Sequence, residues 1–131
     1  MNEGSVAVIE KVLPGTLGEF KQEIMKEYNS VNQMIFKVGV TEQKVSVFED
    51  KIIIIAKHKR IPVLEIIDEA NDILSEIIDR MLIEKSKEVL ALNLMQRFGI
   101  RIKLILKDYD PLTEISGTLI ILDEKLNSVG W

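Results

Sequence analysis

The sequence has no cysteine and a single histidine, His58, among its 131 residues. Without thiols the chain cannot form disulfides, thiolate nucleophiles or cysteine-ligated zinc and iron–sulfur centres. A histidine-dependent zinc site or Ser-His-Asp relay would depend on that one residue. The phosphate-binding glycine loops, the zinc-protease motif and the nucleophile elbow are also missing. We therefore expect a protein that is not an enzyme and uses no cofactor.

Long apolar runs and an excess of positive charge are lacking as well. The longest aliphatic run, residues 52–56, is far shorter than the roughly 18–20 residues that cross a bilayer, and no secretory signal opens the chain. We expect a cytoplasmic protein without direct membrane insertion. The 17 Lys and Arg against 21 Asp and Glu give a net charge of −4, which argues against nucleic acid as a partner.

The length and the 47% hydrophobic content favour one domain over residues 1–131. Within it we expect residues 1–15 to form an N-terminal arm or short lead-in helix, and residues 125–131 to form a tail. Residues 16–19, Thr-Leu-Gly-Glu, match a capping box, so a helix should begin at residue 17. Apolar residues then recur every three or four positions until Gly39, which we expect to end this helix.

A second helical pattern begins at Pro62, a residue suited to the first turn of a helix. Its apolar stripe is interrupted by polar residues 84–88 and resumes before Gly99, the expected end. The pattern predicts either one long bent helix or two consecutive helices. Carboxylates on this segment have the spacing of a solvated stripe, namely Glu65, Asp68, Asp72, Glu76 and Asp79.

Strand patterns follow each helical segment. The first hairpin comprises a strand around residues 45–47, a turn at Glu49-Asp50 and a strand over residues 51–57. Residues 52–55 do not alternate, which favours a central strand buried on both faces. In the second hairpin Ile100, Ile102, Leu104 and Leu106 alternate with mostly charged residues, before a loop over 108–116 and a strand over 118–123.

The order α-β-β-α-β-β predicts an α+β fold, with a four-stranded, mostly antiparallel sheet and long helices packed on one face. The helical surface exceeds what one sheet can cover, so we expect a homodimer.

Residues 57–60, Lys-His-Lys-Arg, form the only run of four basic or histidine residues, at the junction between a strand and a helix. Basic side chains beside a helix N-terminus can bind a small anion, and His58 would make binding depend on pH near neutrality. The alternative is a solvated loop whose charges end an apolar strand. Asp108, Asp110 and Glu114 form an acidic cluster, but without the calcium-loop pattern we expect a metal-free turn.

Over residues 16–124 the chain resembles the MpsC-like family, a domain of unknown function named as the C component of a sodium-translocating system that generates membrane potential. The resemblance rests on Gly39 at a helix end, Arg80 in the long helix, and the segments KVSVFEDKIIII, RIPVLE, RFGIRIKLILKDYD and SGTLIILDE. It implies an association with membrane ion transport and inorganic-carbon supply.

Together these observations predict a dimer that binds a small carboxylate anion such as formate or bicarbonate and reports its level to a transporter or regulatory partner. The expected binding residues are His58, Lys59 and Arg60, with Arg80 and Arg97 as further candidates. The alternative is an interaction or assembly module without a small ligand.

Overall fold

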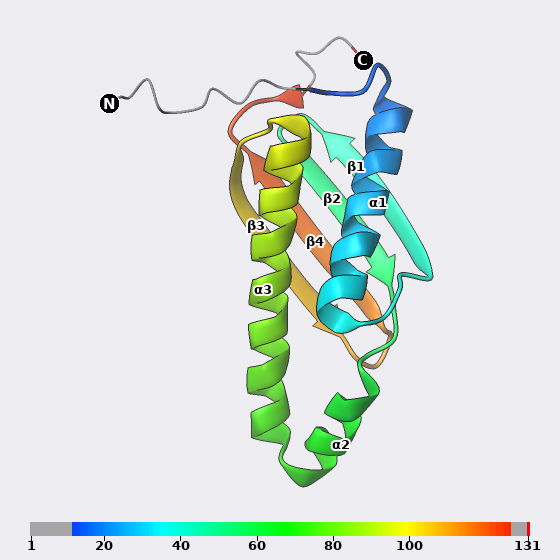
Figure 1. Ribbon diagram of the computed structural model, residues 1–131, viewed down its shortest axis with the longest axis vertical. Helices are drawn as coiled ribbons and strands as arrows, with labels where there is room; N and C mark the ends of the chain where they lie inside the picture. The colour runs from blue at the N-terminus through cyan, green and yellow to red at the C-terminus, as the bar shows by residue number, and fades with distance from the viewer. Residues whose placement is uncertain (1–11, 127–130) are drawn as a thin grey trace, which may run out of the picture.

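The structure is a computed structural model that describes residues 12–126 and residue 131, and within them it shows an α+β fold (Figure 1). Neighbouring strands are all antiparallel, in the order β1-β2-β4-β3, and α1 and α3 cover the same face of the sheet. The predicted fold class is therefore confirmed. The expectations for residues 1–11 and 127–130 lie outside the described residues. In chain order the elements are α1 (Leu17–Phe36), β1 (Glu42–Phe48), β2 (Lys51–Lys57), α2 (Pro62–Ala70), α3 (Asp72–Phe98), β3 (Ile102–Asp110) and β4 (Ile115–Leu122).

The core lies between the two long helices and the face of the sheet that they cover, here called the inner face. The rings of Phe20 on α1 and Phe98 on α3 meet edge to face, with 5.1 Å between centroids, and so join the two helices. Burial of these apolar side chains is the main driving force for the fold. The other fully buried members include Ile24, Ile52, Ile54, Leu94, Ile100 and Ile120.

Helix α1 begins as predicted but ends earlier. The Thr16 hydroxyl accepts a hydrogen bond from the backbone N–H of Glu19 at 3.1 Å. The prediction that Gly39 ends the helix is wrong, because Lys37 adopts the left-handed conformation (φ 61°) directly after Phe36. The side chain of Asn32 donates to the carbonyl of Val38 at 2.9 Å, which ties the segment after the helix back to α1.

The second helical segment is two helices, and the break is at Asn71 rather than at residues 84–88. Asn71 has an extended backbone, and its side chain accepts from the N–H of Leu74 at 3.0 Å, which caps α3. Polar residues 84–88 continue the helix without a break, and within them Lys87 pairs with Glu84 one turn away at 2.9 Å. At Gly99 the helix ends as predicted, with φ 66°.

The hairpin formed by α2 and the first half of α3 extends beyond the end of the sheet (Figure 1). In α2, Leu64 is the buried residue. Several large apolar side chains on this α2–α3 hairpin are exposed, namely Val63, Ile66, Ile73, Leu74, Ile77 and Met81. Within residues 12–126, no helix has both the length and the hydropathy that a membrane span requires.

The sheet corrects two predictions about burial. β2 is central, as expected, but it alternates: Ile53 and Ile55 are 37% and 47% exposed on the face away from the helices, here called the outer face. In β3 a bulge between Ile102 and Leu104 shifts the alternation by one residue. Leu104 and Leu106 therefore lie on the outer face, not in the core, and Ile105 is buried instead.

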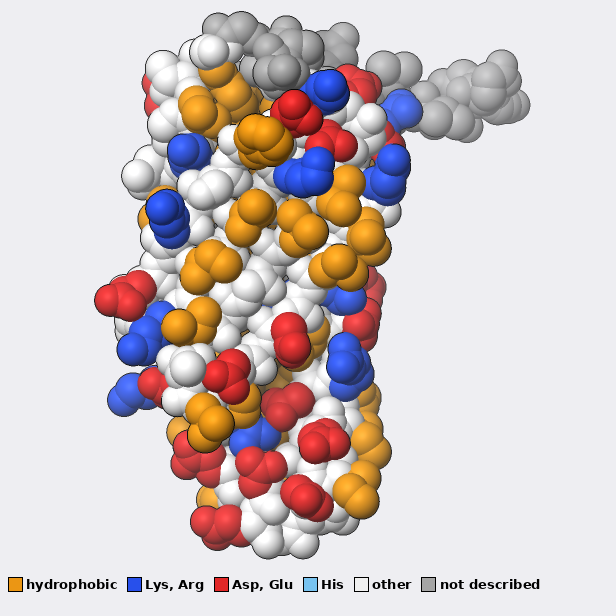
Figure 2. Space-filling view, turned by 180° about the vertical axis from the view of Figure 1, so that it is seen from behind, with side chains coloured by type: hydrophobic (Ala, Val, Ile, Leu, Met, Phe, Trp, Pro, Cys, Tyr) orange, Lys and Arg blue, Asp and Glu red, His pale blue; other side chains and the backbone are white. Residues whose placement is uncertain are grey.

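The predicted loop over residues 108–116 is also shorter than expected. β3 continues to Asp110 and β4 begins at Ile115, so only a tight turn separates them. The carboxylate of Asp110 accepts from both the N–H and the hydroxyl of Thr113, which stabilises this turn. Because β2 alternates and β3 carries a bulge, hydrophobic side chains gather on the outer face of the sheet (Figure 2).

Candidate functional site

A cavity of about 340 Å³ lies beside the ends of β2 and β3, between the sheet and the α2–α3 hairpin. The loop after β2 forms one wall, and α3 forms another. Four of the five predicted binding residues line this cavity: His58, Lys59, Arg60 and Arg80. The remaining lining residues are Phe36, Ile61, Leu64, Glu76, Asp79, Ile83, Asp108, Tyr109 and Pro111.

His58 is 3% exposed and lies between two aromatic rings. The Tyr109 ring stacks on the imidazole with 4.6 Å between centroids, and the Phe36 ring lies 5.6 Å away on α1. The Tyr109 hydroxyl donates to the backbone carbonyl of His58 at 2.9 Å. Burial raises the pKa of Tyr109 to about 12, so this donor keeps its proton at neutral pH.

The imidazole of His58 is neutral at physiological pH because burial lowers its pKa, and the nearby Lys107 acts in the same direction. Nδ1 lies 3.1 Å from the backbone carbonyl of Lys59, and a carbonyl can only accept, so Nδ1 carries the proton. Nε2 is then an acceptor. It is buried and has no hydrogen-bond partner among the residues that the structure describes.

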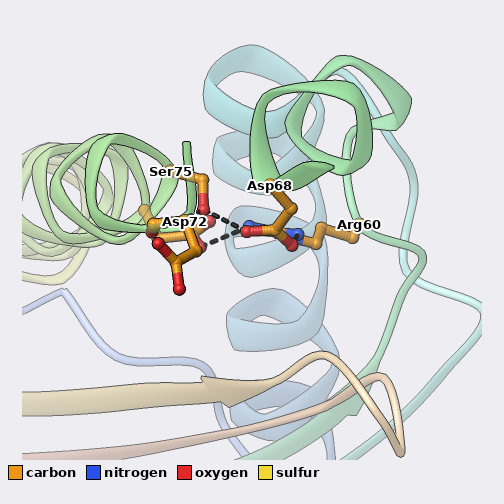
Figure 3. Close-up of polar contacts among 5 residues, drawn as sticks. Arg60, Asp68, Asp72 and Ser75 are labelled. Carbon is orange, nitrogen blue, oxygen red and sulfur yellow. Dashed lines mark hydrogen bonds and ion pairs between the residues drawn. The ribbon is translucent and has the colours of Figure 1, made fainter. Parts of the chain in front are cut away.

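Arg60 joins the loop to both helices of the hairpin. Its guanidinium contacts Asp68 on α2 and, at 2.6 Å, Asp79 on α3. The hydroxyl of Ser75 on α3 also contacts Asp68, so the carboxylate lies between the serine and the arginine (Figure 3). The hydrogen bond from Ser75 and the one from Arg60 both lower the pKa of Asp68. We call this group, Arg60, Asp68, Ser75 and Asp79, the arginine clasp.

The arginine clasp changes the role that Arg60 can have. Its side chain is 9% exposed, and both terminal nitrogens are used to bind carboxylates, which leaves only Nε without a partner in the described structure. Arg60 therefore positions the walls of the cavity. The clasp also corrects the assignment of Asp68 and Asp79 to a purely solvated stripe.

Lys59 and Arg80 are the basic residues of the cavity that remain available. Both are exposed, and no ion pair within the described part of the chain involves either of them. The lining as a whole is balanced, because three acidic residues, Glu76, Asp79 and Asp108, face the three basic ones. The cavity is thus polar and charged without a strong excess of either sign.

Arg97 lies elsewhere. It is near the C-terminal end of α3, where its guanidinium contacts Glu23 and, at 2.8 Å, Glu27 on α1. These contacts tie the two long helices together at the surface. The structure does not bring Arg97 to the cavity.

Two groups of site residues were not identified from the sequence. Asp68 and Asp79 are separated from Arg60 by 8 and 19 positions, so no local spacing indicates the clasp. Phe36 and Tyr109 come from the end of α1 and from β3, and only the folded chain brings their rings to His58. The weak signal that existed was the single histidine directly after a buried strand.

The fold and the cavity together define an α+β protein with a small charged cavity at one end of its sheet. Among the described residues, no group of three or more His, Asp or Glu side chains is arranged to hold a metal ion. No family model, no curated protein and no solved structure matches this chain.

Proposed function

We propose that the protein is a non-enzymatic binder of a small, singly charged carboxylate-type anion, and that bicarbonate suits its cavity better than formate. One observation carries this proposal: His58, Lys59, Arg60 and Arg80 line a single cavity of about 340 Å³. In that cavity Lys59 and Arg80 are exposed, and neither forms an ion pair with a carboxylate among the described residues. Charge-assisted hydrogen bonds from such groups are the strongest contacts a small anion can make.

The charge balance of the cavity limits the anion. Glu76, Asp79 and Asp108 also line it and would repel a ligand that carries two or more negative charges. A singly charged, small anion gains attraction from the two free basic groups with less of this repulsion. Phosphate is therefore a poorer ligand than a one-carbon anion.

The protonation state of His58 supports a ligand that also donates a hydrogen bond. Nε2 is an unpartnered acceptor in a buried, neutral ring. Bicarbonate carries an O–H donor beside its charged oxygens, whereas formate offers acceptors only. Leaving a buried acceptor without a partner costs about 1–3 kcal/mol, so a donor in the ligand favours binding. A small shift of the stacked rings would be needed to expose Nε2, because the atom is buried in the structure.

The resemblance to the MpsC-like family supports the same class of ligand, because it implies an association with inorganic-carbon supply. We propose that the chain acts as a cytoplasmic sensor or accessory subunit for such a system. The anion would change the contacts of a transporter or regulatory partner, and no bond of the ligand is made or broken.

The test is the melting temperature at pH 8 in sodium bicarbonate, formate, phosphate and chloride of matched ionic strength. A ligand at ten times its Kd contributes about 1.4 kcal/mol, or about 3–6 °C for a chain of this size. We expect bicarbonate to raise the melting temperature most and phosphate no more than chloride. Lys59→Gln and Arg80→Gln should each weaken the response.

Arg101→Gln is the matched control, since Arg101 is an exposed arginine between the end of α3 and the start of β3 and does not line the cavity. It should leave the bicarbonate response unchanged. Equal melting temperatures in all four salts would overturn the anion proposal. A formate response equal to that of bicarbonate would overturn the assigned role of His58 Nε2.

A second candidate function, an interaction module without a ligand, is favoured by the exposed apolar residues of the α2–α3 hairpin. Ile66, Ile73 and Ile77 are each more than half exposed there. This function predicts no anion response, and it predicts that a photo-reactive residue at position 66 gives one discrete adduct in cells. Ile73→Ser should abolish that adduct, and a diffuse set of adducts would contradict the interaction function.

A further inference from the structure

The outer face of the sheet is a flat array of side chains whose register is known. Four rows run across the strands in the order β1, β2, β4 and β3. From one end to the other they are Phe48, Lys51, Ile121 and Leu104; Ser46, Ile53, Leu119 and Leu106; Lys44, Ile55, Gly117 and Asp108; and Glu42, Lys57, Ile115 and Asp110.

The first two rows are mainly apolar, and the charges gather in the last two. Ile53, Leu104 and Leu106 are 37%, 44% and 51% exposed, so a substantial part of their apolar surface meets solvent. An apolar sheet face of this kind is normally packed against a second layer. In the described part of the chain, both long helices lie on the inner face and none covers the outer one (Figures 1 and 2).

We propose that a second copy of the chain covers the outer face, with the two-fold axis parallel to the strands. Such an axis reverses the strand order across the interface, so that β1 of one copy lies over β3 of the other and each row lies over the same row. Sheets packed face to face keep their strands within about 30° of each other, which this axis permits.

The match of apolar rows and the charges of the third row favour this orientation. In the third row Lys44, at the β1 edge, comes opposite Asp108, at the β3 edge of the partner copy, and the symmetry makes this pair twice. In the first two rows Ile53 comes opposite Leu119, and Phe48 comes opposite Leu104. The other facing pairs of these rows are Lys51 with Ile121 and Ser46 with Leu106. In the fourth row Glu42 comes opposite Asp110 of the other copy, a like-charge pair. Lys57 pairs with Glu42 in its own sheet and lies within one strand spacing of that Asp110, so a positive charge lies beside both carboxylates.

A two-fold axis across the strands is disfavoured by the same rows. It would place the first row over the fourth and the second over the third. Lys51 would then face Lys57, while Leu104 and Leu106 would face Asp110 and Asp108. Like charges and buried carboxylates against leucine destabilise an interface.

Shape supports the chosen orientation as well. Gly117 has no side chain, and an open hollow lies around it. Its lining is part apolar, with Ile53, Ile55, Leu106 and Leu119, and part charged, with Arg80, Lys87, Lys107 and Asp108. With the axis parallel to the strands, Ile55 of one copy lies over Gly117 of the other and can fill part of that hollow. This inference does not depend on the anion-binding proposal.

The test is a charge reversal measured by sedimentation equilibrium. Lys44→Asp and Asp108→Lys should each raise the dimer dissociation constant by at least about tenfold, and the double variant K44D/D108K should restore most of it. The two positions lie on opposite edges of the sheet, about 14 Å apart at three strand spacings, so they cannot pair within one chain. Rescue therefore reports contact between copies.

Ile53→Asp should give a monomer that keeps its circular dichroism spectrum, and Ile66→Ser on the α2–α3 hairpin is the matched control that should leave the dimer intact. A wild-type chain that is monomeric at about 100 μM, above the micromolar Kd of typical specific dimers, would overturn the proposal. Failure of the double variant to restore the dimer would overturn the orientation. Dissociation by Ile66→Ser but not by Ile53→Asp would assign the interface to the hairpin instead.

Discussion

Arg60 and His58 are two residues apart, yet the fold gives their side chains opposite surroundings. Arg60 contacts two carboxylates and keeps its charge, whereas His58 is enclosed by rings and loses its charge. The same basic segment therefore contributes one positioning residue and one neutral acceptor. Only Lys59, between them, is exposed and unpaired as the sequence suggested.

The arginine clasp should contribute to stability in a way that a surface arginine does not. Arg60→Gln leaves Asp68 and Asp79 without their common partner, and we expect it to lower the free energy of unfolding by about 1–2 kcal/mol. Arg80→Gln, in the same cavity, should change it by less than about 0.5 kcal/mol. Urea denaturation measures both, and equal effects would contradict the clasp.

His58 should make stability depend on pH near neutrality. Because burial lowers its pKa in the folded protein, the unfolded chain binds a proton first, at a pKa of about 6.5. Stability should therefore decrease as the pH falls below about 6.5, until the folded protein also binds the proton. His58→Gln should remove this decrease between pH 7 and 5, measured by urea midpoints. Parallel profiles for both proteins would show that His58 does not titrate differently on folding.

At the residue scale, the sequence indicated where charge gathers but not which charges cancel. The run at residues 57–60 was visible because its members are adjacent. The carboxylates that neutralise Arg60 come from two helices whose relative placement depends on the turn at Asn71. Pairing across a tertiary contact leaves no periodic signal in the chain.

Gly39 and Gly99 were both expected to end a helix, and only Gly99 does so in the structure. Gly99 has φ 66°, where alanine costs about 1 kcal/mol or more, so Gly99→Ala should lower the free energy of unfolding by about that amount. Gly39 is not left-handed, and an added Cβ would meet only the side chains of Gln33 and Asn29, at 3.4 and 3.7 Å. Gly39→Ala should change it by less than about 0.5 kcal/mol. The reverse order in urea denaturation would contradict these helix ends.

At the element scale, periodicity predicted which segments are helices and strands, and capping chemistry predicted the starts of α1 and α2 and the end of α3. The predicted helix boundaries were wrong where another local interaction ended the helix. Lys37 ended α1 before Gly39, and Asn71 broke the second helix before the polar residues 84–88 did. In β2 the alternation between faces could not be seen in the sequence, because isoleucine occupies both the buried inner positions and the exposed outer positions.

Stability should be distributed unevenly over the whole molecule. β2 and β4 are each paired on both sides, and their inner residues Ile52, Ile54 and Ile120 are fully buried. In α2, by contrast, Leu64 is the one buried residue. Hydrogen exchange should be slowest in β2 and β4 and faster in α2 by at least about 100-fold, because local opening of α2 exposes little apolar surface. Protection of α2 equal to that of β2 would indicate that another surface covers it.

At the scale of the whole molecule, the sequence predicted the layers and the antiparallel hairpins, because element order restricts the topology strongly. It did not predict the apolar outer face. That face arises from the bulge in β3 together with the alternation of β2, and both depend on how the strands are paired. Of the cavity walls, the sequence predicted the loop after β2 as a binding segment. It did not predict the walls formed by α3 and β3, because these elements are distant from the loop in the chain.

The bulge near one end of β3 decides what stands at the other end. Because side chains alternate between the two faces along a strand, the one-residue offset persists to Tyr109 and Asp110 at the other end of β3. Without the offset, Asp108 and Asp110 would point to the inner face, and Tyr109 would turn away from His58. The extra residue of the bulge therefore reverses the face on which each later side chain of β3 lies. This reversal determines which β3 side chains reach the cavity, although the bulge itself does not line it. In this chain, the length of a segment specifies the site as much as its composition does.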